Sequence, residues 1–221
     1  MTEAARNPLV VRASAGQTIF LALIMGLMYL RIGHGQSTVQ DRLGSLFFVL
    51  VNLAMSSTTQ VVTTCKNHIL MHFSYIFIVT EQRAVFFREY SNNMYSTLAF
   101  YFAKIIADFP LQIFFPALFS TIVYWMVGFV PDAKQYFIFL AINVLCSNVG
   151  NAYGMLLGAA AKDSNVALTL QPVVLIPFVI FSGYFINSDN VPPYFIWIEY
   201  ISFVKYGFHS LVINEVKQIH R

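Results

Sequence analysis

Residues 137–161, FIFLAINVLCSNVGNAYGMLLGAAA, decide the fold of this chain. They form an uncharged, mostly apolar run, and about 20 such residues suffice for a helix to cross the hydrocarbon core of a bilayer. Within the run, Gly150, Gly154 and Gly158 recur every four residues, so they share one face of a helix and let a second helix approach closely. The run therefore predicts a membrane-spanning helix that packs tightly against a neighbour.

The composition of the whole chain also indicates that it lies in a lipid bilayer. Of 221 residues, 57% are hydrophobic and only 10% are charged, whereas soluble domains carry about 25% charged residues. Such a chain cannot cover a surface that faces water, so we expect an integral, multi-pass membrane protein of the plasma membrane or an intracellular membrane. The net charge is +3, and no tract of Lys and Arg indicates a nucleic-acid partner.

Further apolar runs lie on both sides of residues 137–161. We expect an all-α transmembrane bundle of about five spans, followed by a re-entrant or interfacial element at Val191–Val212 and a polar tail at Asn214–Arg221. Pro110 and Pro116 would kink the third span or divide it into two pieces. The expected spans are Ala13–Leu30, Gly44–Val62, Tyr95–Phe129, Phe137–Ala161 and Val166–Ile186.

Polar side chains inside these spans need partners away from lipid. The amides of Asn52 and Asn151 either join helices or line a cavity, and the sequence leaves both roles open. Lys104 and Asp108, four residues apart, form either an ion relay or an ordinary interfacial pair. Glu199 and Lys205 leave the same two alternatives.

We find no motif for catalysis or nucleotide binding. The phosphate-loop pattern G-x-x-x-x-G-K-[ST] does not occur, so this chain cannot hold ATP by that route. His68 and His72 have the spacing of two ligands on one helix face, which raises the hypothesis of a metal in a membrane enzyme. The other histidines are scattered, so we expect an interfacial role for this pair, and neither a metal site nor catalytic residues.

A set of short motifs runs through the chain in a characteristic order. These motifs are Arg6-Asn7-Pro8, Gln40-Asp41-Arg42-Leu43-Gly44, Leu46-Phe47-Phe48, Ala84-Val85-Phe86-Phe87-Arg88-Glu89, Tyr101-Phe102-Ala103-Lys104, Tyr124-Trp125-Met126-Val127-Gly128, Phe181-Ser182-Gly183 followed by Asn187, Tyr206-Gly207-Phe208 and Asn214-Glu215. Through them the chain resembles the membrane domain, of the ABC-2 type, found in ABC transporters of the G subfamily, the half-transporters that include eye-pigment, sterol and multidrug exporters.

The resemblance implies a role for particular residues. In this family the membrane domain dimerises, and substrate sits at the two-fold axis between the second and fifth spans. The positions matching that cavity are Val51, Asn52, Met55, Ile176 and Val179, and those matching the gate above it are Tyr184 and Phe185. The positions matching the segment that docks on the nucleotide-binding domain are Glu81, Gln82, Arg83, Phe86, Arg88 and Glu89.

The chain also departs from the family pattern. The family usually carries an N-terminal ATP-binding domain, which would hold ATP and Mg²⁺, and a final span after Asn214-Glu215. We therefore expect residues 1–221 to form a partial membrane domain, with a probable insertion at residues 63–80 and Gln82 where the family usually has a glutamate.

Two functions follow from the resemblance. The first is the transmembrane pathway of an ATP-driven exporter for lipids or amphipathic small molecules, working as a homodimer or heterodimer with a nucleotide-binding domain and membrane lipids as partners. The alternative is a truncated, non-transporting module that dimerises with full-length relatives and regulates them. ATP-coupled activity is expected only in a complete transporter.

Overall fold

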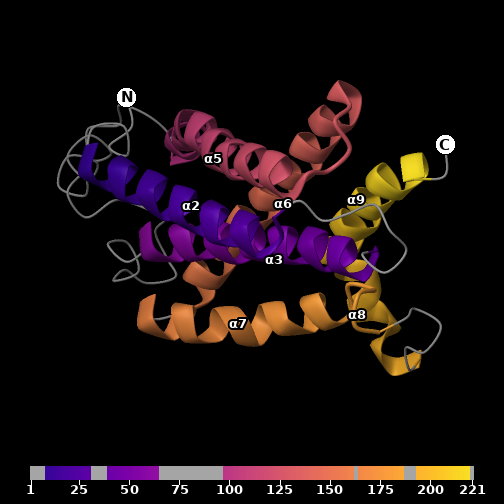
Figure 1. Cartoon of the computed structure of the whole chain (residues 1–221). Helices are drawn as coiled ribbons and strands as arrows, with labels where there is room; N and C mark the ends of the chain where they lie inside the picture. Colours follow the sequence, from indigo (N-terminus) through magenta and orange to yellow (C-terminus); the bar gives the residue numbers. More distant parts are fainter. Residues whose placement is uncertain (1–7, 31–38, 65–96, 162–163, 187–192, 220–221) are drawn as a thin grey trace.

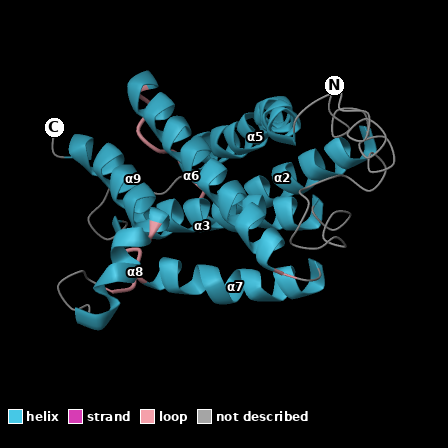
Figure 2. Ribbon diagram, turned by 180° about the vertical axis from the view of Figure 1, so that it is seen from behind, coloured by secondary structure: helices cyan, strands magenta, loops and turns pink. Residues whose placement is uncertain are grey.

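The chain folds into a bundle of helices. A computed structural model describes residues 8–30, 39–64, 97–161, 164–186 and 193–219, and no strand occurs within these ranges (Figures 1 and 2). The expected all-α fold is confirmed. The elements are α2 (Pro8–Met28), α3 (Val39–Thr64), α5 (Thr97–Val127), α6 (Ala133–Ala160), α7 (Ser164–Ile180), η4 (Pro193–Phe195), α8 (Ile196–Ile201) and α9 (Phe203–Ile219).

The described helices have the lengths and hydropathy of a membrane bundle. Three segments are long and apolar enough to cross a bilayer, namely Val39–Val62, Phe109–Val127 and Ala133–Gly158. Ser14–Met28 and Asn165–Ile180 are shorter apolar helices. The five expected spans therefore correspond to three helices of crossing length and two shorter ones.

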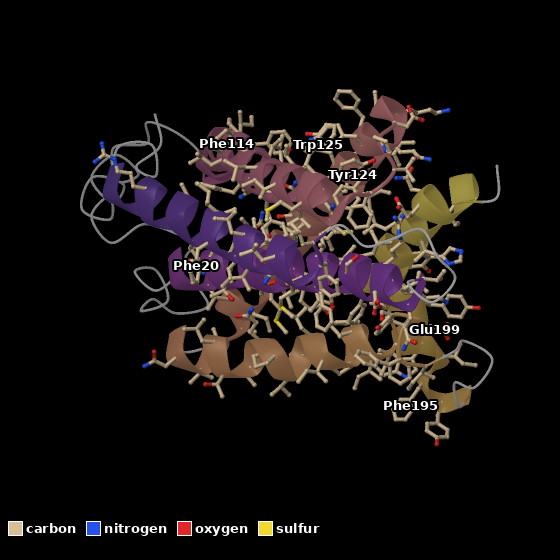
Figure 3. All side chains as sticks on the ribbon, viewed as in Figure 1. Phe20, Phe114, Tyr124, Trp125, Phe195 and Glu199 are labelled. Atoms are coloured by element: carbon tan, nitrogen blue, oxygen red, sulfur yellow. The ribbon has the colours of Figure 1, made fainter. Side chains whose placement is uncertain are left out.

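The outside of the bundle is apolar. Phe20 on α2, Phe114 and Trp125 on α5, and Phe195 next to α8 are all exposed, and Phe20 and Trp125 retain 63% and 65% of their surface (Figure 3). So many exposed large apolar side chains would be costly in water, whereas acyl chains solvate them. The chain is an integral membrane protein.

Helices α3 and α6 form the centre of the bundle. They make the most extensive helix pair, and α3 also contacts α5, α7 and α9. Helix α2 packs on α5 on one side of α3, and α7 runs along the other side (Figures 1 and 2). Helix α2 begins, α3 ends and α5 begins at one end of the bundle, while the start of α3 lies near α8 and α9 at the opposite end (Figure 1).

Two glycines set the distance between α3 and α6. A Cβ atom on Gly154 would lie 2.9 Å from the Thr58 carbonyl oxygen, and one on Gly150 would lie 3.1 Å from the Ala54 carbonyl oxygen. Both neighbours are backbone atoms, which cannot move away without shifting α3. The close approach expected from the glycine spacing is confirmed for these two positions.

The structure excludes a division of the third span, moves the end of the fifth span, and shows which helices form the region after Val191. Helix α5 is one continuous element that includes both of its prolines, so the third span is not divided; membrane helices tolerate proline where neighbouring groups satisfy the freed carbonyls. Helix α7 ends at Ile180 and not at Ile186, and Gly183 in the following turn has a φ of 88°, which suits glycine. The region from Val191 onward contains two α-helices that meet at Ser202.

The expected polar tail is wrong over most of its length. Residues from Asn214 to Ile219 continue α9 and do not form a separate tail. The reason is tertiary, because Glu215 is buried against Arg42 of α3 and Asn214 donates a hydrogen bond to the Gln135 carbonyl of α6. Partners on other helices thus keep a polar stretch helical.

The glycine contacts predict the effect of a single added methyl group. Gly154→Ala should destabilise the bundle by about 1–3 kcal/mol, because the new Cβ forces α3 away from α6. The measurement is the thermal unfolding midpoint of the purified chain in detergent. Gly16→Ala is the matched control, because nothing lies within 4 Å of a Cβ at Gly16 and alanine favours a helix. Equal midpoints for the two variants would contradict the close packing of α3 and α6.

Candidate functional site

The predicted cavity residues divide between two sides of α3. Val51 and Met55 on α3 and Val179 on α7 are half-buried and pack against the main hydrophobic core, whereas Ile176 on α7 is 48% exposed. Asn52 is turned to another side and lines a cavity with residues of α2, α5 and α6. The proximity of α3 and α7 therefore brings together only part of the predicted set within one protomer.

A polar contact between α3 and α7 holds the two helices together beside these residues. The Gln171 side-chain amide donates to the Met55 carbonyl oxygen at 3.0 Å and lies 2.8 Å from the Thr59 hydroxyl. The Thr59 hydroxyl also lies 3.1 Å from the Gln171 side-chain oxygen. Analysis of the sequence missed Gln171, although an isolated glutamine in the apolar run before Pro172 was a signal that could have identified it.

The predicted gate residues belong to an aromatic cluster in the turn after α7. The Tyr184 ring stacks on Phe47 of α3 with centroids 4.6 Å apart and an interplanar angle of 11°. Phe185 and Phe208 contact the Tyr184 ring edge-on at 5.2 and 5.8 Å. One cluster thus connects α3, the turn after α7, and α9. The gate role of Tyr184 and Phe185 stays a prediction.

The Tyr184 hydroxyl lies next to a second tyrosine. A Cβ atom on Gly44 would meet the Tyr184 hydroxyl at 3.2 Å and the Tyr29 hydroxyl at 3.7 Å. Both hydroxyls therefore approach the same position on α3.

A buried ion pair joins α3 to α9 near the same end of the bundle. The Arg42 guanidinium donates to a Glu215 carboxylate oxygen at 2.6 Å, and the two side chains are 4% and 5% exposed. Arg42 precedes the expected second span, which was placed at Gly44–Val62, yet it lies inside α3, which begins at Val39. Sequence analysis noted both residues only as parts of motifs, because no spacing rule pairs positions so far apart.

Glu199 and Lys205 form a second ion pair. The Lys205 ammonium group donates to a Glu199 carboxylate oxygen at 2.6 Å, and its side chain is 26% exposed. The pair links α8 to α9, with Glu199 on the side of the bundle that carries Phe195 (Figure 3). Of the two alternatives left by the sequence, the contact agrees with an ordinary ion pair between Glu199 and Lys205.

Several predicted residues lie outside the described residues. They are Glu81, Gln82, Arg83, Phe86, Arg88 and Glu89 of the coupling segment, both histidines of the metal hypothesis, and residues 65–80 of the probable insertion. The side chains of Lys104 and Asp108 are also outside the described part. Among the residues that the structure does describe, no three His, Cys, Asp or Glu side chains come together as metal ligands.

The sequence as a whole matches a family model. Residues 61–216 match the model described as ABC-2 type transporter, a range that includes the end of α3 and all the helices from α5 to α9 except the last turn. The chain belongs to the ABC-2 type transporter family. This ABC-2 domain carries the interhelical contacts described above and is the membrane domain of ABC transporters of the G type.

Individual relatives agree with this assignment. The domain is 32% identical over 210 residues to "Protein white" of Ceratitis capitata, covering 95% of this chain and 29% of that protein. It is 30% identical over 224 residues to "ABC transporter G family member 1" of Dictyostelium discoideum, covering 100% of this chain and 26% of that protein. It is 29% identical over 210 residues to "ABC transporter ATP-binding protein/permease wht-1" of Caenorhabditis elegans, covering 95% and 29%. The chain thus spans less than a third of the length of these curated relatives.

The buried ion pair predicts a large loss of stability when one charge is removed. Glu215→Gln should destabilise the ABC-2 domain by about 3–5 kcal/mol, because it removes the carboxylate charge that faces the buried Arg42 guanidinium. Replacing both residues, as Arg42→Met with Glu215→Leu, should recover much of that loss. Thermal unfolding in detergent measures each variant.

The second ion pair supplies the control for this comparison. Glu199→Gln should cost less than Glu215→Gln, because Lys205 is partly exposed and retains some solvation. If the two single variants lost the same stability, or if the double replacement were worse than Glu215→Gln, the assigned importance of the Arg42–Glu215 pair would be wrong.

Proposed function

We propose that this ABC-2 domain forms the substrate pathway of an ATP-driven exporter for lipids or other amphipathic small molecules. The observation that carries the proposal is the aromatic cluster around Tyr184 at one end of the α3–α7 contact, beside the predicted cavity residues. Apolar side chains along such a path suit an amphipathic substrate, because a binding pocket for small molecules is mostly apolar with a few polar groups.

In this proposal α3 and α7 of this chain form one wall of the pathway, and another membrane domain forms the opposite wall. Val173, Ile176 and Ile180 on α7 are exposed in the single chain, and a partner seated against α7 would cover them. This partner would be a second copy or a related half-transporter, in the plasma membrane or an intracellular membrane. The exposure of Ile176 next to the half-buried Val179 supports a cavity shared between two protomers.

The energy would come from a nucleotide-binding domain that holds ATP and Mg²⁺. The relative from Caenorhabditis elegans is named both an ATP-binding protein and a permease, which supports the coupling of the two activities. In this proposal residues 81–89 dock on that domain, and they join α3 to α5 along the chain. Closure of the nucleotide-binding domain would then be transmitted through residues 81–89 to α3.

The packing of α3 suggests how such a movement would open the gate. Helices α3 and α6 are in backbone contact at Gly150 and Gly154 and would move as one body. Helix α7 contacts α3 less extensively and is held there by the hydrogen bonds of Gln171. A displacement of α7 would therefore separate Tyr184 from Phe47 while the α3–α6 core stays intact.

The direct test is reconstitution in vesicles with the nucleotide-binding domain of a G-type transporter. We expect ATP-dependent movement of a fluorescent amphipathic lipid only when both domains are present. ATPase stimulation by the membrane domain verifies that the two are coupled. A coupled, dimeric preparation that moves no lipid or other amphipathic dye would contradict the proposal. Co-expression with a full-length relative would then test the non-transporting alternative through the loss of that relative's efflux.

A substitution in the predicted cavity tests the pathway itself. Ile176→Trp should lower ATP-dependent transport by at least about tenfold, because the larger ring fills the space between protomers. Leu170→Trp is the matched control, since Leu170 is also exposed on α7 but lies about 120° away around the helix. Transport in vesicles is compared at equal amounts of assembled dimer. A pathway between α3 and α7 is excluded if both variants transport equally well.

A further inference from the structure

We propose that ordered water fills a small polar cavity between α2, α3, α5 and α6 and links the Gln112 carbonyl of α5 to the Asn151 side chain of α6. The cavity has a volume of about 30 Å³. One buried water needs about 10–15 Å³ of such space and two to four polar partners, so the cavity has room for one or two water molecules. None of its lining residues belongs to α7, α8 or α9, so the site is separate from the pathway proposed between α3 and α7.

The walls of the cavity supply hydrogen-bonding groups and no charge. On α3 the lining side chains include Asn52 and Ser56, which are half-buried and about one turn apart. The polar lining continues through Gln17 of α2 and Gln60 of α3 toward the end of the bundle where α2 begins and α3 ends (Figure 1), which gives water a polar route into the cavity. None of the lining residues is charged, so a buried ion would find no counter-charge here. These walls favour water.

The side chain of Asn151 needs a hydrogen-bond partner inside the cavity. Asn151 is only 6% exposed and lines the cavity, and its side chain makes no hydrogen bond to another residue of the described ranges. Ser147, one turn away on the same wall, is already bonded to the Ser57 hydroxyl. An amide that is buried without a hydrogen bond costs free energy, and acyl chains offer it no partner. A water molecule in the cavity removes this cost.

A proline on α5 frees a second polar group at the same cavity. Pro116 is buried inside α5 and lines the cavity together with Gln112. Proline has no N–H, so the Gln112 carbonyl lacks the donor that the residue four positions later normally provides. Residues four apart share one helix face, which places this carbonyl on the cavity side of α5. Ordered water is one of the groups that satisfy such freed carbonyls in membrane helices.

The water would connect parts of the bundle that have little direct contact. Helix α5 contacts α6 extensively but α3 only slightly, and the cavity lies between these three helices. Helix α2 packs mainly on α5. A bridge from Gln112 to Asn151 therefore ties the α2–α5 pair to the α3–α6 centre.

A double-mutant cycle tests the bridge. Asn151→Leu alone should destabilise the chain, because it removes one end of the bridge and leaves the Gln112 carbonyl less well satisfied. Pro116→Ala restores an N–H for that carbonyl, so Asn151→Leu should cost less in this background. We expect the effect of Asn151→Leu on the unfolding equilibrium constant to shrink by at least about fivefold, within the range found for coupled positions. Equilibrium unfolding of the purified chain by SDS measures each variant.

The other proline of α5 provides the matched control. Pro110 is exposed and does not line the cavity, and Ile106, whose carbonyl it frees, is exposed as well. Asn151→Leu should therefore have the same effect with and without Pro110→Ala. If the effects of Asn151→Leu and Pro116→Ala were simply additive, the two positions would share no partner and the bridge would be refuted.

Solid-state NMR in lipid vesicles detects the water in the chain without any change at the cavity. Residues 150–151 are the one Gly-Asn pair in the sequence, so labelling of glycine carbonyls and asparagine nitrogens assigns the Asn151 signals. The Asn151 side-chain amide should receive magnetisation from water faster than that of Asn148, which is half-buried, bonds the Val144 carbonyl and lies outside the cavity lining. Loss of a signal in Asn148→Leu assigns this control.

Two results of the NMR measurement would overturn the proposal. Transfer from water to Asn151 that is no faster than to Asn148 would mean that the cavity holds no water. Transfer to Asn151 from acyl-chain protons alone would mean that a lipid tail fills the cavity. Neither the cycle nor the NMR measurement uses ATP, so a negative outcome would leave the proposed transport function untouched.

Discussion

The contact between the backbones of α3 and α6 is the constraint on which the rest of the structure depends. Inside a bilayer the hydrophobic effect does not drive helices together, so close packing and hydrogen bonds must do so. Gly150 and Gly154 allow this approach, and it places the Thr58 hydroxyl 3.0 Å from the Gly150 carbonyl oxygen. The same approach joins Ser57 to Ser147. With larger residues at the glycines these polar groups would be separated.

Around this central pair, the remaining helices are attached in different ways. Helix α9 is held to α3 by a buried ion pair, which tolerates little change because each charge needs the other. Helix α7 is held by the amide of Gln171 and by apolar packing. Helix α2 packs mainly on α5. The Phe178 carbonyl of α7 also accepts a hydrogen bond from Ser202 between α8 and α9, so α7 is attached through side chains whereas α3 and α6 approach through their backbones.

Helix α3 presents different chemistry to its two sides. Val51 and Met55 contribute to the core near α7, while Asn52 and Ser57 line the cavity toward α2, α5 and α6. Consecutive residues of a helix point about 100° apart, so one polar span presents different side chains to α7 and to the cavity. A polar residue in this helix cannot be assigned to either side without its neighbours. The two readings of Asn52, as helix contact or cavity lining, depend on that assignment.

The sequence by itself determined the membrane environment, the all-α fold class and the family of this chain. Low charge and apolar runs such as residues 137–161 leave a bilayer as the environment, and in a bilayer a chain must satisfy its backbone within helices or a closed barrel. The glycine spacing also predicted the tight α3–α6 contact, because a repeat of four residues defines one helix face. These features are local, so they can be read along the chain.

Only the tertiary structure decided which polar groups meet. Arg42 and Glu215 are 173 positions apart, and Gln171 finds Met55 across a helix interface, so no local pattern pairs them. The same holds for the end of α9, which was expected to be a polar tail and is helical because α3 and α6 provide partners. The cavity lined by Asn151 likewise exists only where four helices converge. Such contacts depend on how helices are placed around the central pair, which is information that a single helix does not carry.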